Sequence, residues 1–89
     1  MKLKYKYSFQ EYDNRYLAIV DFLETEDERR MLWVNECGKM IMELLHTDIT
    51  RFGIINALTE RYSGDVTAIE TTVDDFIKQL SDAGLLINM

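Results

Sequence analysis

The feature that most constrains the fold of this chain is a change of hydrophobic period at Asn35. Before this residue, apolar and polar side chains alternate, which is the period-2 pattern of half-buried strands. After it, apolar residues recur at the three- and four-residue spacing of one helical face. Strands followed by helices are typical of an α+β domain. Because 89 residues build only one small core, we expect a single domain over residues 1–89.

Three strands are predicted in the first part of the chain. The first is the alternating segment 2–10, and the second is segment 16–23, which is rich in β-branched and aromatic residues. The dipeptide Asp13-Asn14 between them tolerates the backbone angles of a tight turn, so we expect a hairpin. After a polar connection, Arg29–Val34 is predicted as a short third strand.

Three helices are predicted after the strands. Asn35 is suited to cap the first, because its side chain can accept a hydrogen bond from a free N–H of the first turn. The second helix is expected to begin near Thr50. The third is expected to open with a capping box formed by Thr67 and Glu70 and to end at Gly84.

Each predicted helix has one apolar face. The expected core residues are Cys37, Ile41, Leu44 and Leu45 in the first helix, Ile54, Ile55, Leu58 and Tyr62 in the second, and Ile69, Val73, Phe76, Ile77 and Leu80 in the third. The short apolar tail 85–87 is expected to pack back on this core.

No set of side chains in the sequence predicts catalysis. His46 is the only histidine and is expected at the surface of a helix end. Cys37 is the only cysteine, and we interpret it as a small core residue that shares a helical face with Ile41. Asp74 and Asp75 are adjacent, so they diverge by about 100° on a helix and cannot act as an acid–base pair. We therefore predict no enzyme, with no catalytic residue, no cofactor and no metal.

Charge and hydropathy exclude other classes of protein. The net charge of −6, from 16 acidic and 10 basic side chains, opposes binding to nucleic acid. No apolar run approaches the roughly 20 residues of a membrane span, and three lysines interrupt the first ten residues where a secretory signal would lie. A single cysteine suits a reducing compartment. We expect a cytoplasmic protein that binds neither nucleic acid nor membrane.

Three segments carry a resemblance to a known family. They are MLWVNECGKMIMELL at 31–45, DITRFGIINALTERY at 48–62 and VDDFIKQLSDAGLL at 73–86. In this order and spacing they resemble the PqqD family, whose members are recognition elements for ribosomally made precursor peptides. The likeness covers roughly residues 29–87. Gly53 departs from it, because a capping glutamate is common at that position and its loss weakens the start of the helix.

The resemblance implies a winged-helix-like fold in which an N-terminal three-stranded antiparallel sheet precedes three helices. It also implies a non-catalytic chaperone. The leader of a precursor peptide would add as a strand beside the third strand and lie in a groove against the third helix. The domain would then present the precursor to a modifying enzyme, commonly a radical S-adenosylmethionine (radical SAM) maturase, which carries the cofactors itself.

The residues themselves suit this role. Strand addition needs an edge with unpaired N–H and C=O groups, and the short third strand is a plausible edge. An ordinary core position is the alternative for the helix residues of the predicted site, and a solvated surface position is the alternative for its arginines. The predicted peptide-binding residues are Arg29, Arg30, Met31, Leu32, Trp33, Val34, Val73, Phe76 and Ile77.

Two other hypotheses remain beside the peptide chaperone. A winged-helix nucleic-acid-binding regulator shares the fold outline, although the acidic charge opposes it. An enzyme in its own right is opposed by the missing catalytic groups. A free strand edge also permits self-association, so both a monomer and a homodimer are compatible with the sequence.

Overall fold

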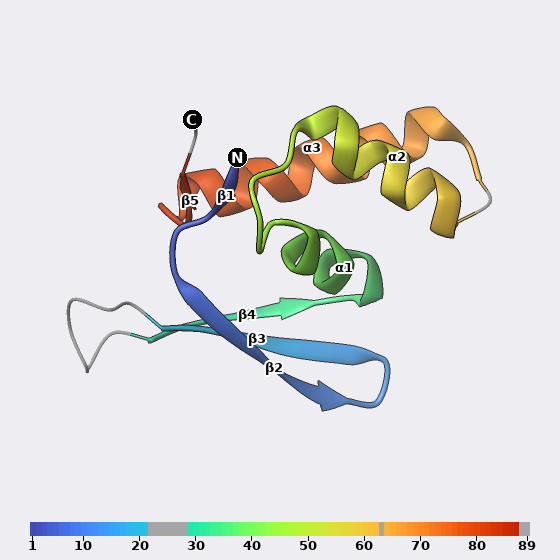
Figure 1. Cartoon of the computed structure of the whole chain (residues 1–89). Coiled ribbons are helices and arrows are strands. Elements are labelled where there is room, and N and C mark those ends of the chain that lie inside the picture. Colours follow the sequence, from blue (N-terminus) through green and yellow to red (C-terminus); the bar gives the residue numbers. More distant parts are fainter. Residues whose placement is uncertain (22–28, 63, 88–89) are drawn as a thin grey trace.

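The computed structural model describes residues 1–21, 29–62 and 64–87, apart from the side chains of Arg29 and Arg30. The described residues form five strands and three helices (Figure 1): β1 (Lys2–Leu3), β2 (Lys6–Tyr12), β3 (Arg15–Asp21), β4 (Arg29–Val34), α1 (Glu36–Leu44), α2 (Arg51–Arg61), α3 (Val66–Asp82) and β5 (Leu86–Ile87). The predicted α+β class, a three-stranded antiparallel sheet followed by three helices, is confirmed. The end of the predicted second strand, after Asp21, lies outside the described residues.

The main sheet has the strand order β2-β3-β4, and both pairings are antiparallel. Tyr12 pairs with Arg15 across a two-residue loop, as the turn signal predicted. Asp13 has a φ of 52°, the positive value that a two-residue hairpin loop needs at its first position. Its short polar side chain makes this conformation tolerable for a residue other than glycine.

The prediction of one strand over residues 2–10 was wrong in its extent. Residues 2–3 form β1, which pairs with β5 at the other end of the chain, and β2 begins only at Lys6. The backbone N–H of Leu3 donates to Leu45 O at 2.9 Å, and that of Lys4 donates to Leu85 O at 2.8 Å. These bonds turn the first residues away from the main sheet and hold them on the helices.

Side-chain caps set the starts of the helices. Asn35 Oδ1 accepts from Gly38 N at 2.8 Å, which confirms the predicted cap of α1. The cap predicted for α3 was wrong. Asp65 is the N-cap and accepts from Thr67 N at 3.0 Å, so Thr67 lies already inside the helix. Asp65 has the extended backbone that an N-cap requires, and its carboxylate accepts the Thr67 N–H, which the capping-box hypothesis assigned to the Glu70 side chain.

The helices all lie on one face of the main sheet: α1 packs on the sheet, and α2 and α3 lie on the far side of α1 (Figure 1). The inner face of the sheet contributes Ala18, Val20 and Val34 to a core that is completed by residues of all three helices. The buried hydrophobic residues are Leu3, Ala18, Val20, Val34, Ile41, Met42, Leu45, Ile54, Ile55, Leu58, Val73, Leu80 and Leu85. None of the helices in the described part of the chain has the length and apolarity needed to cross a membrane.

Candidate functional site

Strand β4 is an edge of the main sheet. It pairs with β3 on one side, and no other strand of the described residues pairs with its second side. The strand follows β3 with an unbroken register from residue 29 to residue 34. An edge of this kind presents a row of N–H and C=O groups that a further strand can pair with.

The direction of the backbone groups in β4 follows from the hairpin. A two-residue loop requires that its flanking residues, Tyr12 and Arg15, form the hydrogen-bonded pair that closes it. Backbone groups of successive residues point to opposite sides of a strand, so the even-numbered residues of β3 bond to β4. The register pairs even-numbered with even-numbered residues. We infer that the N–H and C=O groups of Met31 and Trp33 point to the open edge.

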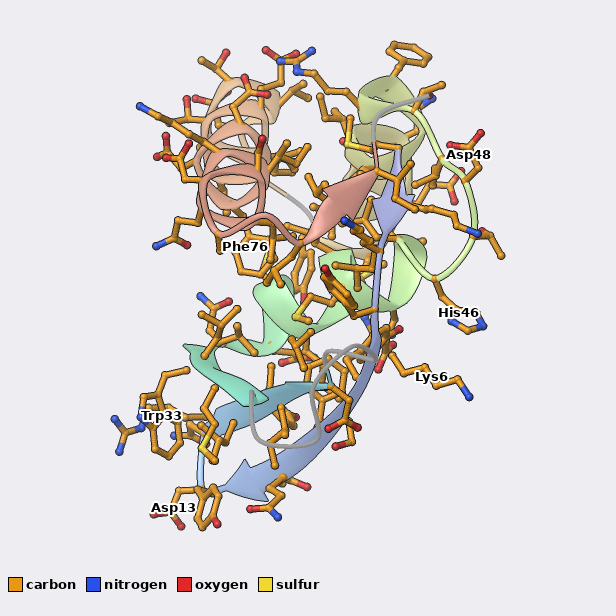
Figure 2. All side chains as sticks on the ribbon, turned by 90° about the vertical axis from the view of Figure 1, so that its left-hand side faces the viewer. Lys6, Asp13, Trp33, His46, Asp48 and Phe76 are labelled. Atoms are coloured by element: carbon orange, nitrogen blue, oxygen red, sulfur yellow. The ribbon has the colours of Figure 1, made fainter. Side chains whose placement is uncertain are left out.

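A groove separates β4 from α3. It has a volume of about 390 Å³ and is lined by Leu32, Trp33, Val34, Phe76, Gln79, Leu80, Asp82 and Ala83. A second hollow of about 230 Å³ adjoins it and shares Phe76 and Gln79, its other lining residues being Asn35, Gly38, Ile41, Thr72 and Asp75. We call the two together the β4–α3 groove. It runs along the side of the molecule, and Figure 2 shows Phe76 on the helix above the strand that carries Trp33.

The helix wall of the groove is one stripe of α3. Thr72, Phe76, Gln79 and Ala83 recur at spacings of four, three and four residues, which places them on one side of the helix. Two carboxylates border this stripe, since Asp75 and Asp82 also line the groove. The wall therefore combines an apolar centre at Phe76 with an acidic border.

Gly38 fixes the position of the Phe76 ring. A Cβ placed on Gly38 would lie 3.0 Å from Phe76 Cε2 and 3.1 Å from Val34 Cβ, closer than side chains normally pack. Any larger residue at this position would require the ring or the Val34 side chain to shift by a few tenths of an ångström. This role was not predicted from the sequence, in which Gly38 was one residue of segment 31–45, which resembles the PqqD family.

The structure separates the predicted peptide-binding residues into groups. Leu32, Trp33, Val34 and Phe76 line the groove. The register nevertheless places the Trp33 side chain on the outer face of the sheet, together with Met31. Met31 lies on the outer face of the sheet with 60% of its surface exposed. The backbones of Arg29 and Arg30 begin β4, and their side chains lie outside the described part of the structure.

The two remaining helix residues of the predicted site face elsewhere. Val73 is fully buried, so the alternative of an ordinary core position describes it. Ile77 is partly buried and packs against the core. Both lie on the core side of α3, about 100° around the helix from the stripe that lines the groove. Gln79 and Ala83, which were not predicted, line the groove wall instead. Sequence periodicity identified the apolar face of α3 and gave no signal for the half-polar stripe beside it.

Among the described residues, Cys37 and the Arg51–Asp74 pair have shifted pKa values and lie outside the groove. Burial, and secondarily the carboxylate of Glu36, raises the pKa of the Cys37 thiol, which favours the uncharged form that suits a packed side chain. Arg51 forms a two-bond ion pair with Asp74, with Nε–Oδ1 at 2.6 Å, and this pair lowers the pKa of Asp74. It joins α2 to α3 on the solvent side. Within the described residues, no three metal-binding side chains lie close enough to hold an ion.

Comparisons with known proteins bear on the fold and the family of the chain. No curated protein matches the chain. A solved structure described as "TbiB1 in Complex with the TbiA(beta) Leader Peptide" has the same fold, with a TM-score of 0.72 and 22% sequence identity over 100% of this chain and 98% of that chain. The family model "Coenzyme PQQ synthesis protein D (PqqD)" matches residues 19–86, which is well over half of the sequence and includes β4, α1, α2 and α3. The chain belongs to the PqqD family.

Proposed function

We propose that this chain is a non-catalytic recognition domain that binds the leader of a ribosomally synthesised precursor peptide. The leader adds as a strand to the open edge of β4 and places alternate side chains in the β4–α3 groove. The observation that carries the proposal is the open edge facing a groove with an aromatic centre. The structural neighbour TbiB1 is a protein solved with a leader peptide, which supports the same class of ligand here.

The binding energy has two sources. Backbone hydrogen bonds to Met31 and Trp33 give affinity without selecting a sequence, and groove side chains select apolar residues. A few such anchors correspond to a Kd on the order of micromolar, about −8 kcal/mol. Leader residues that face the groove meet Phe76 at its centre and the carboxylates of Asp75 and Asp82 at its border. We therefore expect apolar inward residues, flanked by neutral or basic ones.

The modifying enzyme is proposed to be a separate partner, a radical SAM maturase, as the family resemblance implies. In this proposal the chain acts in the cytoplasm as one domain, either as a monomer or as a homodimer, and the maturase supplies the cofactors. The comparisons give no support to the alternative of a winged-helix nucleic-acid-binding regulator.

Phe76→Asp tests the proposal, with Phe52→Asp as its matched control. Phe52 is 70% exposed on α2 and lies outside the groove, so both variants exchange the same side chains. The ligand is a synthetic leader peptide, taken from a short precursor to be sought among the open reading frames that neighbour this gene. We expect Phe76→Asp to weaken leader binding by at least about tenfold, because it places a charge at the apolar centre. Phe52→Asp should bind as the wild type does.

Two measurements make this test interpretable. Circular dichroism and thermal unfolding of both variants establish that each is folded before its affinity is compared. Amide chemical shifts of the wild type, recorded as leader is added, locate the peptide. Shifts at Met31, Trp33 and along α3 support strand addition. Shifts confined to β2 and the hairpin loop, with β4 and α3 unmoved, would contradict it.

A further inference from the structure

The outer face of the main sheet, opposite the core, carries an exposed group of large side chains. Tyr12, Met31 and Trp33 are 48%, 60% and 56% exposed. Leu17 is paired with Trp33 and Ile19 with Met31, so both lie on the same face and are partly buried. Exposed apolar side chains that lie together on one face can mark a contact site.

This surface is ordered around Trp33. The Tyr12 ring meets the Trp33 ring edge-to-face, with centroids 5.6 Å apart and an interplanar angle of 69°. The Arg15 guanidinium carbon lies 4.8 Å from the Trp33 ring centroid, within the range of a cation–π contact. We call Tyr12, Arg15, Met31 and Trp33 the outer cluster. In Figure 2, Trp33 points away from the helices at the sheet's margin.

The outer cluster is continuous with the edge at which the leader is proposed to bind. Residues directly opposite each other in neighbouring strands point their side chains to the same face. Leader residues opposite Met31 and Trp33 therefore project onto the outer face, and the residues between them project into the β4–α3 groove. An added strand would thus contact two surfaces, the β4–α3 groove on one face and the outer cluster on the other.

The two surfaces differ in charge. Asp75 and Asp82 border the groove, whereas the charged member of the outer cluster is Arg15. Arg15 forms no ion pair with any of the described residues, in contrast to Arg51 and Arg61. A carboxylate on the leader is repelled by the groove border and attracted by the outer cluster. Since a shift of one residue moves every side chain of a strand to the other face, this difference selects one register.

We propose that the outer cluster is a second recognition site for the same peptide, specific for a leader segment in which an apolar residue faces Met31 and an acidic residue faces Trp33 and pairs with Arg15. The proposal rests on the proposed function, because it needs the leader to lie along β4. It adds a substrate class: strands with apolar side chains on the inward face, and an apolar–x–acidic or acidic–x–apolar pair on the outward face.

Selection from a display library of random 12-residue peptides tests the proposal without knowledge of the natural leader. The wild type, Arg15→Glu and the control Arg61→Glu are used as separate baits. Arg61 is an exposed arginine of α2, and its ion pair with Glu36 is long, at 3.6 Å. Because both variants exchange an arginine for a glutamate, Arg61→Glu changes the net charge by the same amount as Arg15→Glu. We expect wild type and Arg61→Glu to enrich Asp or Glu two residues from an apolar residue. Arg15→Glu should enrich Lys or Arg at the acidic position.

Synthetic peptides then measure the effect. An acidic peptide selected by the wild type should bind Arg15→Glu about five- to tenfold more weakly, the size expected for one exposed ion pair turned repulsive. Replacing the acidic residue of that peptide by lysine should restore most of the affinity for Arg15→Glu. Amide shifts at Met31 and Trp33 confirm that each peptide lies on β4.

The outcomes distinguish this proposal from the proposed function. One outcome is that the selected peptides shift the β4 amides, show no acidic preference, and have the same sequences whether wild type or Arg15→Glu is the bait. This outcome overturns the outer site and leaves strand addition intact. A failure of every selected peptide to shift the β4 amides overturns strand addition and the outer site with it. Sedimentation showing a wild-type dimer that Trp33→Ala dissociates would assign the outer cluster to a second copy, and would also overturn the proposal.

Discussion

The candidate site depends on a residue that contributes no side chain. At Gly38 the first turn of α1, the end of β4 and the Phe76 ring meet, and the same residue donates its N–H to the Asn35 cap. A side chain at position 38 would have to displace the Phe76 ring, or disturb the cap hydrogen bond by moving the turn. The shape of the groove and the start of α1 therefore both depend on Gly38.

Gly38→Val should destabilise the protein and disturb the groove together. Its Cβ would press on Phe76 Cε2 and Val34 Cβ, of which the Phe76 ring can move and the Val34 Cβ is held in the sheet. Overpacking of this kind costs about 1–3 kcal/mol, which exceeds the gain of up to about 1 kcal/mol from replacing glycine in a helix. Urea unfolding measures the change. An unfolding midpoint equal to that of the wild type would contradict the packing of Phe76 described here.

At the scale of the elements, the end of α3 is closed by two backbone hydrogen bonds. Gly84 N donates to Ser81 O at 2.9 Å, and Leu85 N donates to Leu80 O at 2.9 Å. This is the Schellman arrangement, and it needs a left-handed residue, which Gly84 supplies with a φ of +74°. Leu80 and Leu85 are both fully buried, so the reversal returns the chain to the core just before β5.

Gly84→Ala isolates the backbone cost of this reversal. No heavy atom lies near the Cβ that alanine would add, so the expected loss of about 1 kcal/mol comes from the positive φ alone. Gly64→Ala is the matched control, because its added Cβ also meets open space and its φ is not in the positive range. Denaturant unfolding of both variants should show a loss for Gly84→Ala only. Equal midpoints for the two variants would contradict the backbone explanation.

The elements with a clear period were predictable, and the very short ones were not. Asn35, Thr50 and Gly84 gave correct helix boundaries, because each has a local chemical reason to be there. β1 and β5 have two residues each, too few for any period, and their pairing depends on contacts between the two ends of the chain.

The candidate site was predictable on its strand side and only partly on its helix side. The short segment 29–34 indicated an edge strand by its own pattern, and Phe76 lay on a face that periodicity could find. Gln79 and Ala83 gave no signal, because a groove wall is defined by what it faces across the gap. The outer cluster was also hidden, since Tyr12 and Trp33 are far apart in sequence and meet only through the sheet register.

At the scale of the whole molecule, charge is unevenly distributed. The chain carries −6 overall, yet the hollow formed by the start of the chain is basic. It has a volume of about 610 Å³ and is lined by Lys2, Leu3, Lys4, Tyr5, Lys6, Tyr7 and His46. Figure 2 shows Lys6 and His46 on the opposite side of the molecule from Trp33. If the protein bound nucleic acid, this basic hollow would be the expected binding surface.

Duplex DNA should not bind to the protein, even through this basic hollow. Binding to a duplex gains its free energy from counterion release, which requires several phosphates to be neutralised together, and the remaining acidic surface repels the flanking phosphates. We expect no mobility shift in low salt at protein concentrations of about 10 µM, a range in which non-specific DNA binders associate. Leader peptide titrated in the same buffer shows that the protein is active. A salt-sensitive shift that the triple variant Lys2→Glu, Lys4→Glu and Lys6→Glu abolishes would instead support a nucleic-acid-binding protein, with the basic hollow as its site.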